Sequence, residues 1–132
     1  MHKVIIDTNV FISGIVYRGN PRKVIEAWLT KKMIVCLSPE LKAEILRKLQ
    51  RKFFLPPDSL ARIEVDLHIN TKKFVPQTHI SLVRDPNDNF LLELAEEANA
   101  DYIISGDKDL LILKNYKGTK ILTPAEFLLI VK

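Results

Sequence analysis

Short apolar runs alternate with longer amphipathic segments along this chain, and that alternation restricts the fold more than any other feature. The runs at residues 3–6, 33–37, 102–105 and 120–122 have the length and composition of buried strands. Strands that alternate with helices indicate a parallel sheet with right-handed crossovers. The 132 residues are about the length of one domain. We therefore expect an α/β fold and a single domain over residues 1–132.

Helix starts are marked by prolines and by capping residues. Pro21 and Pro39 each suit the first position of a helix, and Ser38 can cap the second of these helices. The expected helices cover residues 10–17, 21–32 and 39–53, a segment opening at 58 or 59, and residues 88–98, 107–113 and 124–131. Residues 74–75 and 80–83 are expected to be extended, with 74–75 as a candidate additional strand.

Acidic residues lie just after two of the expected strands and at the start of one expected helix. Asp7 follows the first strand, Asp107 follows the strand at 102–105, and Asp85 and Asp88 lie at the start of a helix. In an open parallel sheet the carboxyl ends of the strands share one edge, where ligands bind. Carboxylates gathered there repel one another unless a divalent cation lies among their oxygens. The sequence therefore predicts metal-assisted phosphoryl chemistry at this edge.

Each acidic motif also has a structural explanation. Asp7 could cap the helix that follows it, although Thr8 and Asn9 could also orient its carboxylate as a metal ligand. The Asp-Pro-Asn turn and the preference for Asp at a helix start account for one acid, whereas Asp85 and Asp88 together fit one cap and one ligand.

The motif at 105–109 leaves the same choice open. Gly106 permits a tight turn, Asp107 could reach the site, and Asp109 could cap the short helix. Ser105 could orient a carboxylate or a water molecule. The alternative is an ordinary junction of strand, turn and helix.

Basic residues outnumber acidic ones, 20 to 16, giving a net charge of +4. A modestly basic surface around an acidic site suits a polyanionic substrate, although many soluble proteins carry such a charge. Arg18, Arg84 and Lys108 are the candidate contacts for a nucleic-acid backbone. The helical patch of basic residues within 47–52 could face solvent or phosphate, and we favour solvent. By spacing alone, Glu44 would form a solvated pair with Lys48 one turn later.

Several other classes of site lack support in the sequence. The chain has four glycines and neither of the usual glycine-rich phosphate motifs. Its three histidines are scattered and lack the spacing of a zinc site. Cys36, the one cysteine, lies in an apolar run, so we expect a buried thiol, no intramolecular disulfide and a cytoplasmic protein. We expect no leader peptide and no membrane span.

Four motifs taken in order resemble the PIN-domain family of metal-dependent ribonucleases, and most of all the small prokaryotic PIN toxins of toxin–antitoxin pairs. The motifs are Ile6-Asp-Thr-Asn-Val10, Ser38-Pro-Glu-Leu-Lys-Ala-Glu44, Val83-Arg-Asp-Pro-Asn-Asp88 and Ile104-Ser-Gly-Asp-Lys-Asp-Leu110. The resemblance covers essentially the whole chain. It implies a Rossmann-like three-layer α/β/α sandwich around a central parallel sheet.

The resemblance also implies an acidic quartet that holds one or two Mg²⁺ or Mn²⁺ ions. Its positions match Asp7, Glu44, Asp88 and Asp107. Glu44 becomes a candidate ligand on this resemblance and not on its spacing. Asn9 and Ser105 match polar supporting positions; Thr8, Asp85 and Asp109 remain secondary candidates.

The implied activity is hydrolysis of RNA phosphodiester bonds, leaving a 5′-phosphate and a 3′-hydroxyl, by the toxin of a toxin–antitoxin pair. The implied partners are an RNA substrate, a small antitoxin protein and a second copy of the chain. The alternative is a catalytically idle PIN-like module that binds RNA or protein. Phosphatases of the haloacid type and response receivers fit less well, because Asn9 and Thr8 stand where they require acidic residues.

Overall fold

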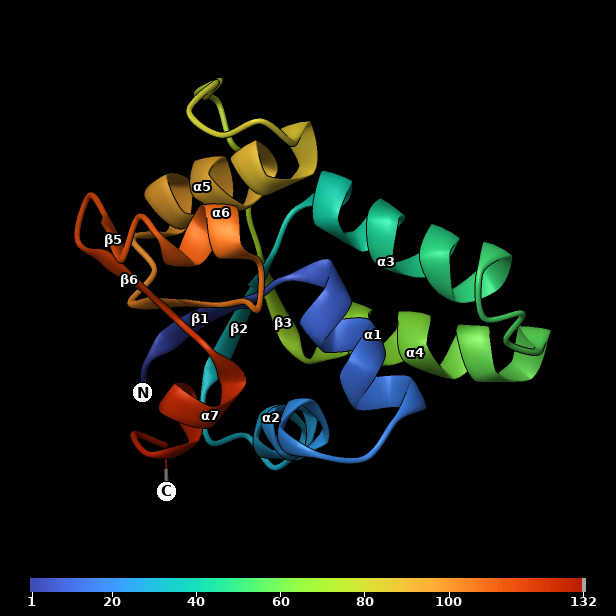
Figure 1. The fold of residues 1–132 in the computed structure, drawn as a ribbon. Helices are drawn as coiled ribbons and strands as arrows, with labels where there is room; N and C mark the ends of the chain where they lie inside the picture. Colours follow the sequence, from blue (N-terminus) through green and yellow to red (C-terminus); the bar gives the residue numbers. More distant parts are fainter. Residues whose placement is uncertain (132) are drawn as a thin grey trace.

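The computed structural model describes residues 1–131 and contains one six-stranded sheet surrounded by helices (Figure 1). The strands are β1 (Lys3–Ile6), β2 (Ile34–Leu37), β3 (Thr71–Lys73), β4 (Tyr102–Ile104), β5 (Asn115–Tyr116) and β6 (Thr119–Leu122). The helices are α1 (Thr8–Val16), α2 (Asn20–Leu29), α3 (Pro39–Arg51), α4 (Pro57–Ile69), α5 (Pro86–Ala98), α6 (Lys108–Leu111) and α7 (Pro124–Leu128).

The strand order is β3-β2-β1-β4-β6-β5, and every pair is parallel except β5 with β6. The chain therefore builds outward from β1 in one direction, through β2 and β3, and then in the other, through β4 and β6. This reversal beside β1 leaves a crevice at the carboxyl ends of β1 and β4, the usual location of a ligand site in such a sheet. The expected α/β architecture is confirmed, with one antiparallel edge strand added.

Helices cover both faces of the sheet. In Figure 1, α5 lies above the strands, α1, α2 and α7 lie below them, and α3 and α4 form a hairpin that projects to one side. The core between these layers is apolar, and its largest fully buried side chains include Phe11, Phe127, Ile5, Leu92, Leu94 and Ile103. Cys36 is also buried, and burial raises the pKa of its thiol to about 11, as expected for an unreactive cysteine.

Helices α1 and α2 approach closely at Gly14. A Cβ atom added to Gly14 would lie 2.6 Å from the carbonyl oxygen of Pro21 and would collide with the Ile25 side chain. Only glycine allows this contact without a shift of one helix. The contact matters for the site because α1 begins directly after Asp7.

Several elements differ from those that the sequence predicts; among the helices, α1 begins at Thr8, α2 ends at Leu29 and α6 ends at Leu111, instead of at residues 10, 32 and 113. The additional strand is β3, at residues 71–73, and only the Phe74 N–H extends its pairing, donating to the Leu37 carbonyl at 2.9 Å. The two-residue strand β5 was not expected. Helix α7 ends at Leu128 instead of residue 131, and α5 begins at Pro86, two residues before Asp88. Local apolar content misplaces β3, because a polar edge strand lacks the apolar signal of a buried one.

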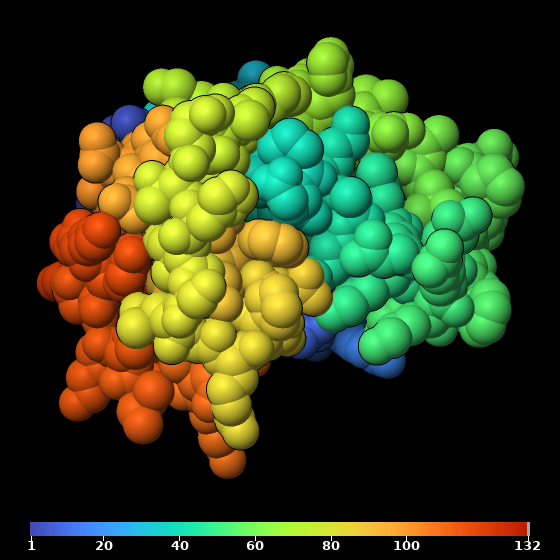
Figure 2. Space-filling view, turned by 90° about the horizontal axis from the view of Figure 1, so that it is seen from above, coloured from blue at the N-terminus to red at the C-terminus, as the bar shows by residue number. Residues whose placement is uncertain are grey.

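The segment between β3 and α5 is held on the outside of α5 by buried polar side chains. Asn89 accepts hydrogen bonds from the backbone N–H groups of Leu82 and Val83, and Glu93 accepts one from Ile80. Figure 2 shows this segment, in yellow, lying over the surface of the molecule. Within residues 1–131, no helix has the length and apolar character needed to cross a membrane.

Candidate active site

Asp7 lies at the carboxyl end of the central strand and is fixed by two hydrogen bonds. Its Oδ1 accepts from the Val10 N–H at 2.8 Å, which caps α1, and its Oδ2 accepts from the Ser105 hydroxyl at 2.5 Å. The side chain is 4% exposed. Burial raises the pKa of Asp7 despite these two bonds. The structure therefore combines the cap and the edge carboxylate that the sequence left as alternatives.

Asp107 faces Asp7 from the end of β4 and is tied to the same serine. The Ser105 hydroxyl accepts from the Asp107 N–H at 3.0 Å, and Asp107 Oδ1 accepts from the Asp109 N–H at 2.8 Å. Asp107, and not Asp109, is the cap of α6, which corrects the role expected for Asp109. The Asp109 carboxylate instead pairs with the guanidinium of Arg84, with its shortest contact at 2.9 Å.

Asp88 is the third acid of this group, and one of its oxygens has no partner. It lies in the first turn of α5, is 7% exposed, and has an Oδ2 atom that is buried with no hydrogen bond among the described residues. Burial, first, and then repulsion from nearby carboxylates raise the pKa of Asp88 to about 7. The repelling carboxylates are those of Asp107, Asp85 and Asp7.

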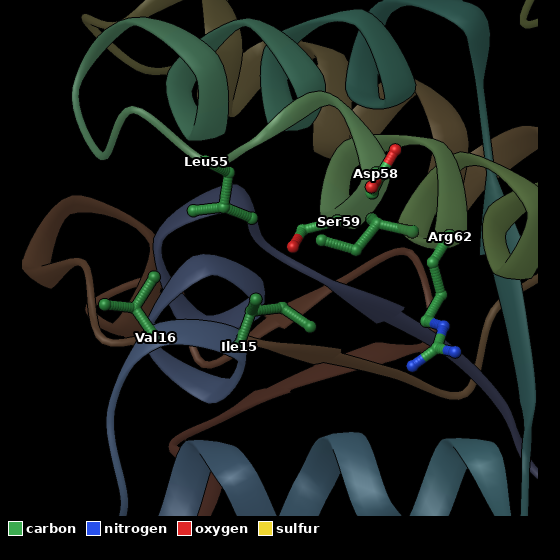
Figure 3. A pocket seen from close by; sticks show the side chains of 7 residues that line it. Ile15, Val16, Leu55, Asp58, Ser59 and Arg62 are labelled. Atoms are coloured by element: carbon green, nitrogen blue, oxygen red, sulfur yellow. The ribbon is translucent and has the colours of Figure 1, made fainter.

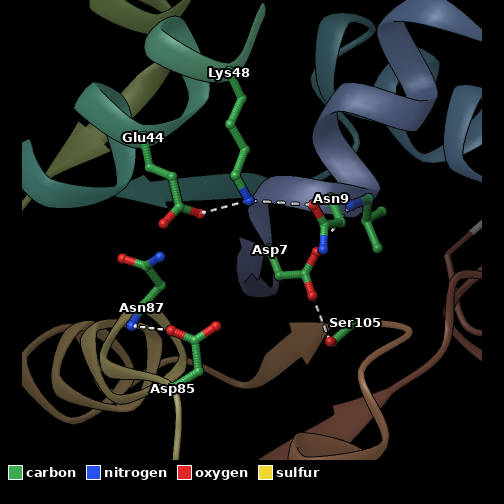
Figure 4. A network of polar contacts seen from close by, with 8 residues as sticks. Asp7, Asn9, Glu44, Lys48, Asp85, Asn87 and Ser105 are labelled. Atoms are coloured by element: carbon green, nitrogen blue, oxygen red, sulfur yellow. Dashed lines mark hydrogen bonds and ion pairs between the residues drawn. The ribbon is translucent and has the colours of Figure 1, made fainter. Parts of the chain in front are cut away.

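Asp85 precedes this helix as its cap. Its Oδ1 accepts from the Asn87 N–H at 2.9 Å, and the residue is exposed (Figure 4). The pair of acids at 85 and 88 thus divides as the sequence suggested, into one cap and one carboxylate held near the edge of the sheet. Sequence reasoning missed Asn89 and Glu93, which hold the preceding segment. The available signal was two polar residues four apart, on one side of an otherwise apolar stretch of helix.

Glu44 extends from α3 toward the side of the site where Lys48, Asn9 and Asp7 lie (Figure 4). The Glu44 side chain is buried, and its Oε1 lies 3.8 Å from the Lys48 ammonium. Lys48 Nζ also lies 3.5 Å from Asn9 Oδ1. The expected Glu44–Lys48 pair is therefore present, but at the edge of the site and not in open solvent. The Asn9 side chain faces Lys48, so Ser105 and the Val10 N–H hold the Asp7 carboxylate, and Asn9 acts on it through its backbone N–H.

A hollow of about 330 Å³ opens beside these residues, lined by Asp7, Asn9, Val10, Ser13, Pro21, Gly106, Asp107 and Pro124. A larger hollow, of about 560 Å³, lies between α1 and α4, where Ile15, Val16 and Leu55 face Arg62 (Figure 3). The larger one contains a single carboxylate, Asp58, and none of the acidic motifs. The smaller hollow contains Asp7 and Asp107, so its chemistry, rather than its volume, places it at the candidate site, although Glu44 and Asp88 do not line it.

The donor atoms fit a divalent cation, although the side chains are not yet arranged around one. Within residues 1–131, no three acidic, histidine or cysteine side chains are grouped so that they could hold a metal ion. The available donors are nevertheless carboxylate oxygens, which Mg²⁺ and Mn²⁺ prefer, and the buried Asp88 Oδ2 has no hydrogen-bond partner among residues 1–131. Glu44 could join them through the carboxylate oxygen that does not face Lys48, or by leaving Lys48.

The three basic residues that the sequence favoured occupy different surroundings. Lys108 is exposed directly after Asp107. Arg84 is paired with Asp109, so its charge is partly neutralised. Arg18 follows the far end of α1, and the helix places it roughly 15 Å along the axis from Asp7.

The arrangement can be compared with known proteins. The sequence model of the PIN domain family matches residues 3–109 of this chain. This chain belongs to the PIN-domain family. It is 32% identical, over 96% of its length and 89% of the relative's, to the uncharacterized protein MJ1680 of Methanocaldococcus jannaschii.

Two solved PIN-fold structures support the architecture. The PIN domain endonuclease Utp24 aligns with 92% of this chain and 84% of its own, at a TM-score of 0.54 and 19% identity. VapBC2 from Rickettsia felis was solved bound to a DNA fragment from its promoter. It aligns with 90% of this chain and 96% of its own, at a TM-score of 0.57 and 12% identity. At these identities the likeness concerns the fold. The PIN domain described here therefore has the fold of a nuclease family, with acidic residues at the edge where such a sheet binds ligands.

Proposed function

We propose that this PIN domain is a metal-dependent endoribonuclease that hydrolyses RNA phosphodiester bonds. The observation that carries the proposal is the gathering of Asp7, Asp88 and Asp107 at one edge of the sheet, with a buried Asp88 oxygen that nothing in the described residues satisfies. Carboxylates that raise one another's pKa are costly to a fold and are typical of functional sites. Glu44 is the fourth proposed ligand.

In the proposed site, some residues position the carboxylates and others would hold the metal ion. Ser105 and the Val10 N–H hold the Asp7 carboxylate in one orientation, and Ser105 holds the turn that carries Asp107. A bound Mg²⁺ or Mn²⁺ would neutralise charge that develops on the scissile phosphate and lower the pKa of the attacking water. Burial of Asp7 and Asp88 strengthens their attraction for such a cation.

Cleavage of a labelled single-stranded RNA by the purified protein tests the proposal. We expect cutting with Mn²⁺ or Mg²⁺, none in EDTA, and a loss of at least about a hundredfold in Asp7→Asn. Asn keeps the size of the side chain and can still cap α1. The matched control is Asp58→Asn, which removes an exposed acid of α4 and should leave the rate unchanged. Cutting by Asp7→Asn at the wild-type rate would show that the site assignment is wrong.

We further propose that the protein is the toxin of a toxin–antitoxin pair and forms a homodimer. The likeness to VapBC2 supports the toxin role at the level of the fold. The end of the chain supports association, because Leu129 is 78% and Ile130 40% exposed next to the buried Phe127. Light scattering on the cleavage preparation should give twice the 15.2 kDa chain mass, and a mass of 15.2 kDa at high concentration contradicts the homodimer.

One observation favours a second candidate, a catalytically idle PIN module that binds RNA or protein. Lys48 already neutralises Glu44, so the site has its own cation where a metal would have to bind. Calorimetric titration with Mn²⁺ separates the two candidates. Binding that is lost in Asp7→Asn supports the nuclease, whereas the absence of Mn²⁺ binding supports the idle module.

A further inference from the structure

The C-terminal half of α3 carries a basic edge that leads away from the candidate site. At about 100° per residue, Lys48 and Arg51 fall within about 40° of Glu44 around the helix axis, and Arg47 falls about 60° to one side. We call Arg47, Lys48 and Arg51 the basic edge of α3. Residues 45–54 contain no acidic side chain. The edge is therefore a stretch of one charge that begins at the proposed ligand Glu44.

The charges of this edge are available to a ligand. Arg47 and Arg51 are exposed, and neither takes part in an ion pair within the part of the chain that the structure describes. Arg84, which the sequence favoured for this role, is instead held by Asp109. Lys48 is the member closest to the site, through Glu44 and Asn9. The basic edge thus offers the unpaired guanidinium groups that the region near Asp107 and Asp109 does not.

Helix α1 runs beside the basic edge and ends in an exposed aromatic ring. Asn9 at the start of α1 faces Lys48, and Tyr17 at its end contacts Phe53 just beyond α3, with ring centroids 6.3 Å apart. The two helices therefore run in the same direction, from the site outward, over about 12 Å. Tyr17 is 57% exposed although Phe53 supports its ring. A base could stack there without disturbing the core.

We propose that the basic edge of α3 and Tyr17 form a docking track for a single strand of RNA, which they lead into the acidic site. Arg47 and Arg51 contact phosphates, Tyr17 stacks on a base, and Lys48 lies where the strand reaches Glu44. Single-strand binding surfaces combine a basic groove along the backbone with aromatic rings that accept any base. The identity of the strand as substrate rests on the function proposed above, but its binding does not.

Binding measured without cleavage tests the track. Fluorescence anisotropy of a labelled single-stranded RNA in EDTA, from about 50 mM to about 200 mM KCl, gives both the affinity and its salt dependence. For Arg47→Gln/Arg51→Gln we expect roughly fivefold to tenfold weaker binding and a slope of log affinity against log salt that is smaller by about 1.4, the value for two phosphate contacts on a single strand.

The matched control is Lys31→Gln/Lys32→Gln, which removes the same charge from two exposed residues. These residues precede β2, at the amino ends of the strands, whereas the candidate site lies at the carboxyl ends. Its slope should stay at the wild-type value. Tyr17→Ala should weaken binding about fivefold or more with no change of slope, while Tyr17→Phe keeps the ring and binds as wild type does. Circular dichroism of each variant confirms that the fold is intact.

The outcomes separate this inference from the proposed function. If both double variants change the slope equally, or if neither changes it, the track is wrong even when the wild type cleaves RNA. If the wild type cuts in neither metal while only Arg47→Gln/Arg51→Gln changes the slope, the nuclease is wrong and the track stands. Tyr17→Ala with wild-type affinity would remove the stacking role.

Discussion

The two sides of the candidate site are built differently. On one side, Asp7, Ser105 and Asp107 are joined by hydrogen bonds of 2.5 to 3.0 Å that also fix the start of α1 and the turn after β4. On the other side, Lys48 is the one partner that the described residues offer to the Glu44 carboxylate, at 3.8 Å, and Lys48 reaches Asn9 at 3.5 Å. The first side is part of the backbone architecture; the second is a contact between side chains of two helices.

This difference indicates which part of the site can adapt. Bonds that also cap a helix or a turn cannot be exchanged without local loss of structure. The Glu44–Lys48 contact is long, at 3.8 Å, and the Lys48 side chain is 26% exposed, so this pair is held loosely and can exchange partners. We therefore expect Glu44 and Lys48 to rearrange when a cation or a phosphate arrives, while Asp7 and Asp107 stay in place.

Substitution of Asp88 should have the largest effect on the free energy of unfolding, because burial and the neighbouring carboxylates disfavour the charged form of this side chain. The folded protein binds the Asp88 proton more tightly than the unfolded chain, so its contribution to stability is present below its ordinary pKa of 3.8 and is lost as pH rises toward 7. Asp88→Asn should therefore be more stable than wild type, by a margin that grows by about 2 kcal/mol between about pH 5 and about pH 8. Urea unfolding in EDTA measures this margin. If the difference in the free energy of unfolding between Asp88→Asn and wild type did not change with pH, the pKa of Asp88 would not be raised in the folded protein.

Ser105→Ala breaks the rigid side of the site. It removes the hydroxyl that donates to Asp7 and accepts from the Asp107 N–H, at a residue that is fully buried. We expect a loss of about 1.5 to 2 kcal/mol in the free energy of unfolding, typical of a hydrogen bond to a charged group. Thermal or urea unfolding measures it, with Ser59→Ala, on the exposed start of α4, as the control. If Ser105→Ala lowered the free energy of unfolding as little as Ser59→Ala does, the hydrogen bonds around Asp7 and Asp107 would not make their side of the site more rigid than the side of Glu44.

Lys48→Met tests the adaptable side and should lower the free energy of unfolding least, by about 1 kcal/mol, because the pair is long and Lys48 is partly exposed, although Met leaves the buried Glu44 carboxylate without this partner. Its effect should appear in metal binding. With Glu44 released, we expect Mn²⁺ to bind about threefold to tenfold more tightly by calorimetry, a gain comparable to that of one ion pair. Weaker Mn²⁺ binding would mean that Lys48 supports the ligand set instead of competing with it.

The sequence predicted the elements whose signals are local and strong. β1 is a continuous apolar run directly before Asp7, and α3 has both a Ser38 cap and a proline start, so their positions were confirmed. The hairpin of β5 and β6 was missed, because β5 has two residues and no apolar pattern. Its turn at Lys117 and Gly118, both with positive φ, was the available signal, since such turns favour glycine.

The site was less predictable than the fold, because its contacts join residues far apart in the chain. That Asp7, Asp88 and Asp107 share one edge follows from the topology of a parallel sheet and could be predicted. The Arg84–Asp109 pair, 25 residues apart, and the approach of Lys48 to Asn9 depend on how α5, α6 and α3 pack. No spacing in the sequence encodes those distances, and for the basic residues of α3 solvent was accordingly favoured over phosphate.

The contact at Gly14 has a consequence for exchanging parts between related proteins. Because α1 carries Asp7 at its first turn, any side chain that pushes α1 away from Pro21 and Ile25 would displace that carboxylate as well. Residues 7 to 25 must therefore be inherited together. A chimaera that takes α1 from one relative and α2 from another is expected to fail unless both parents have glycine at the crossing point.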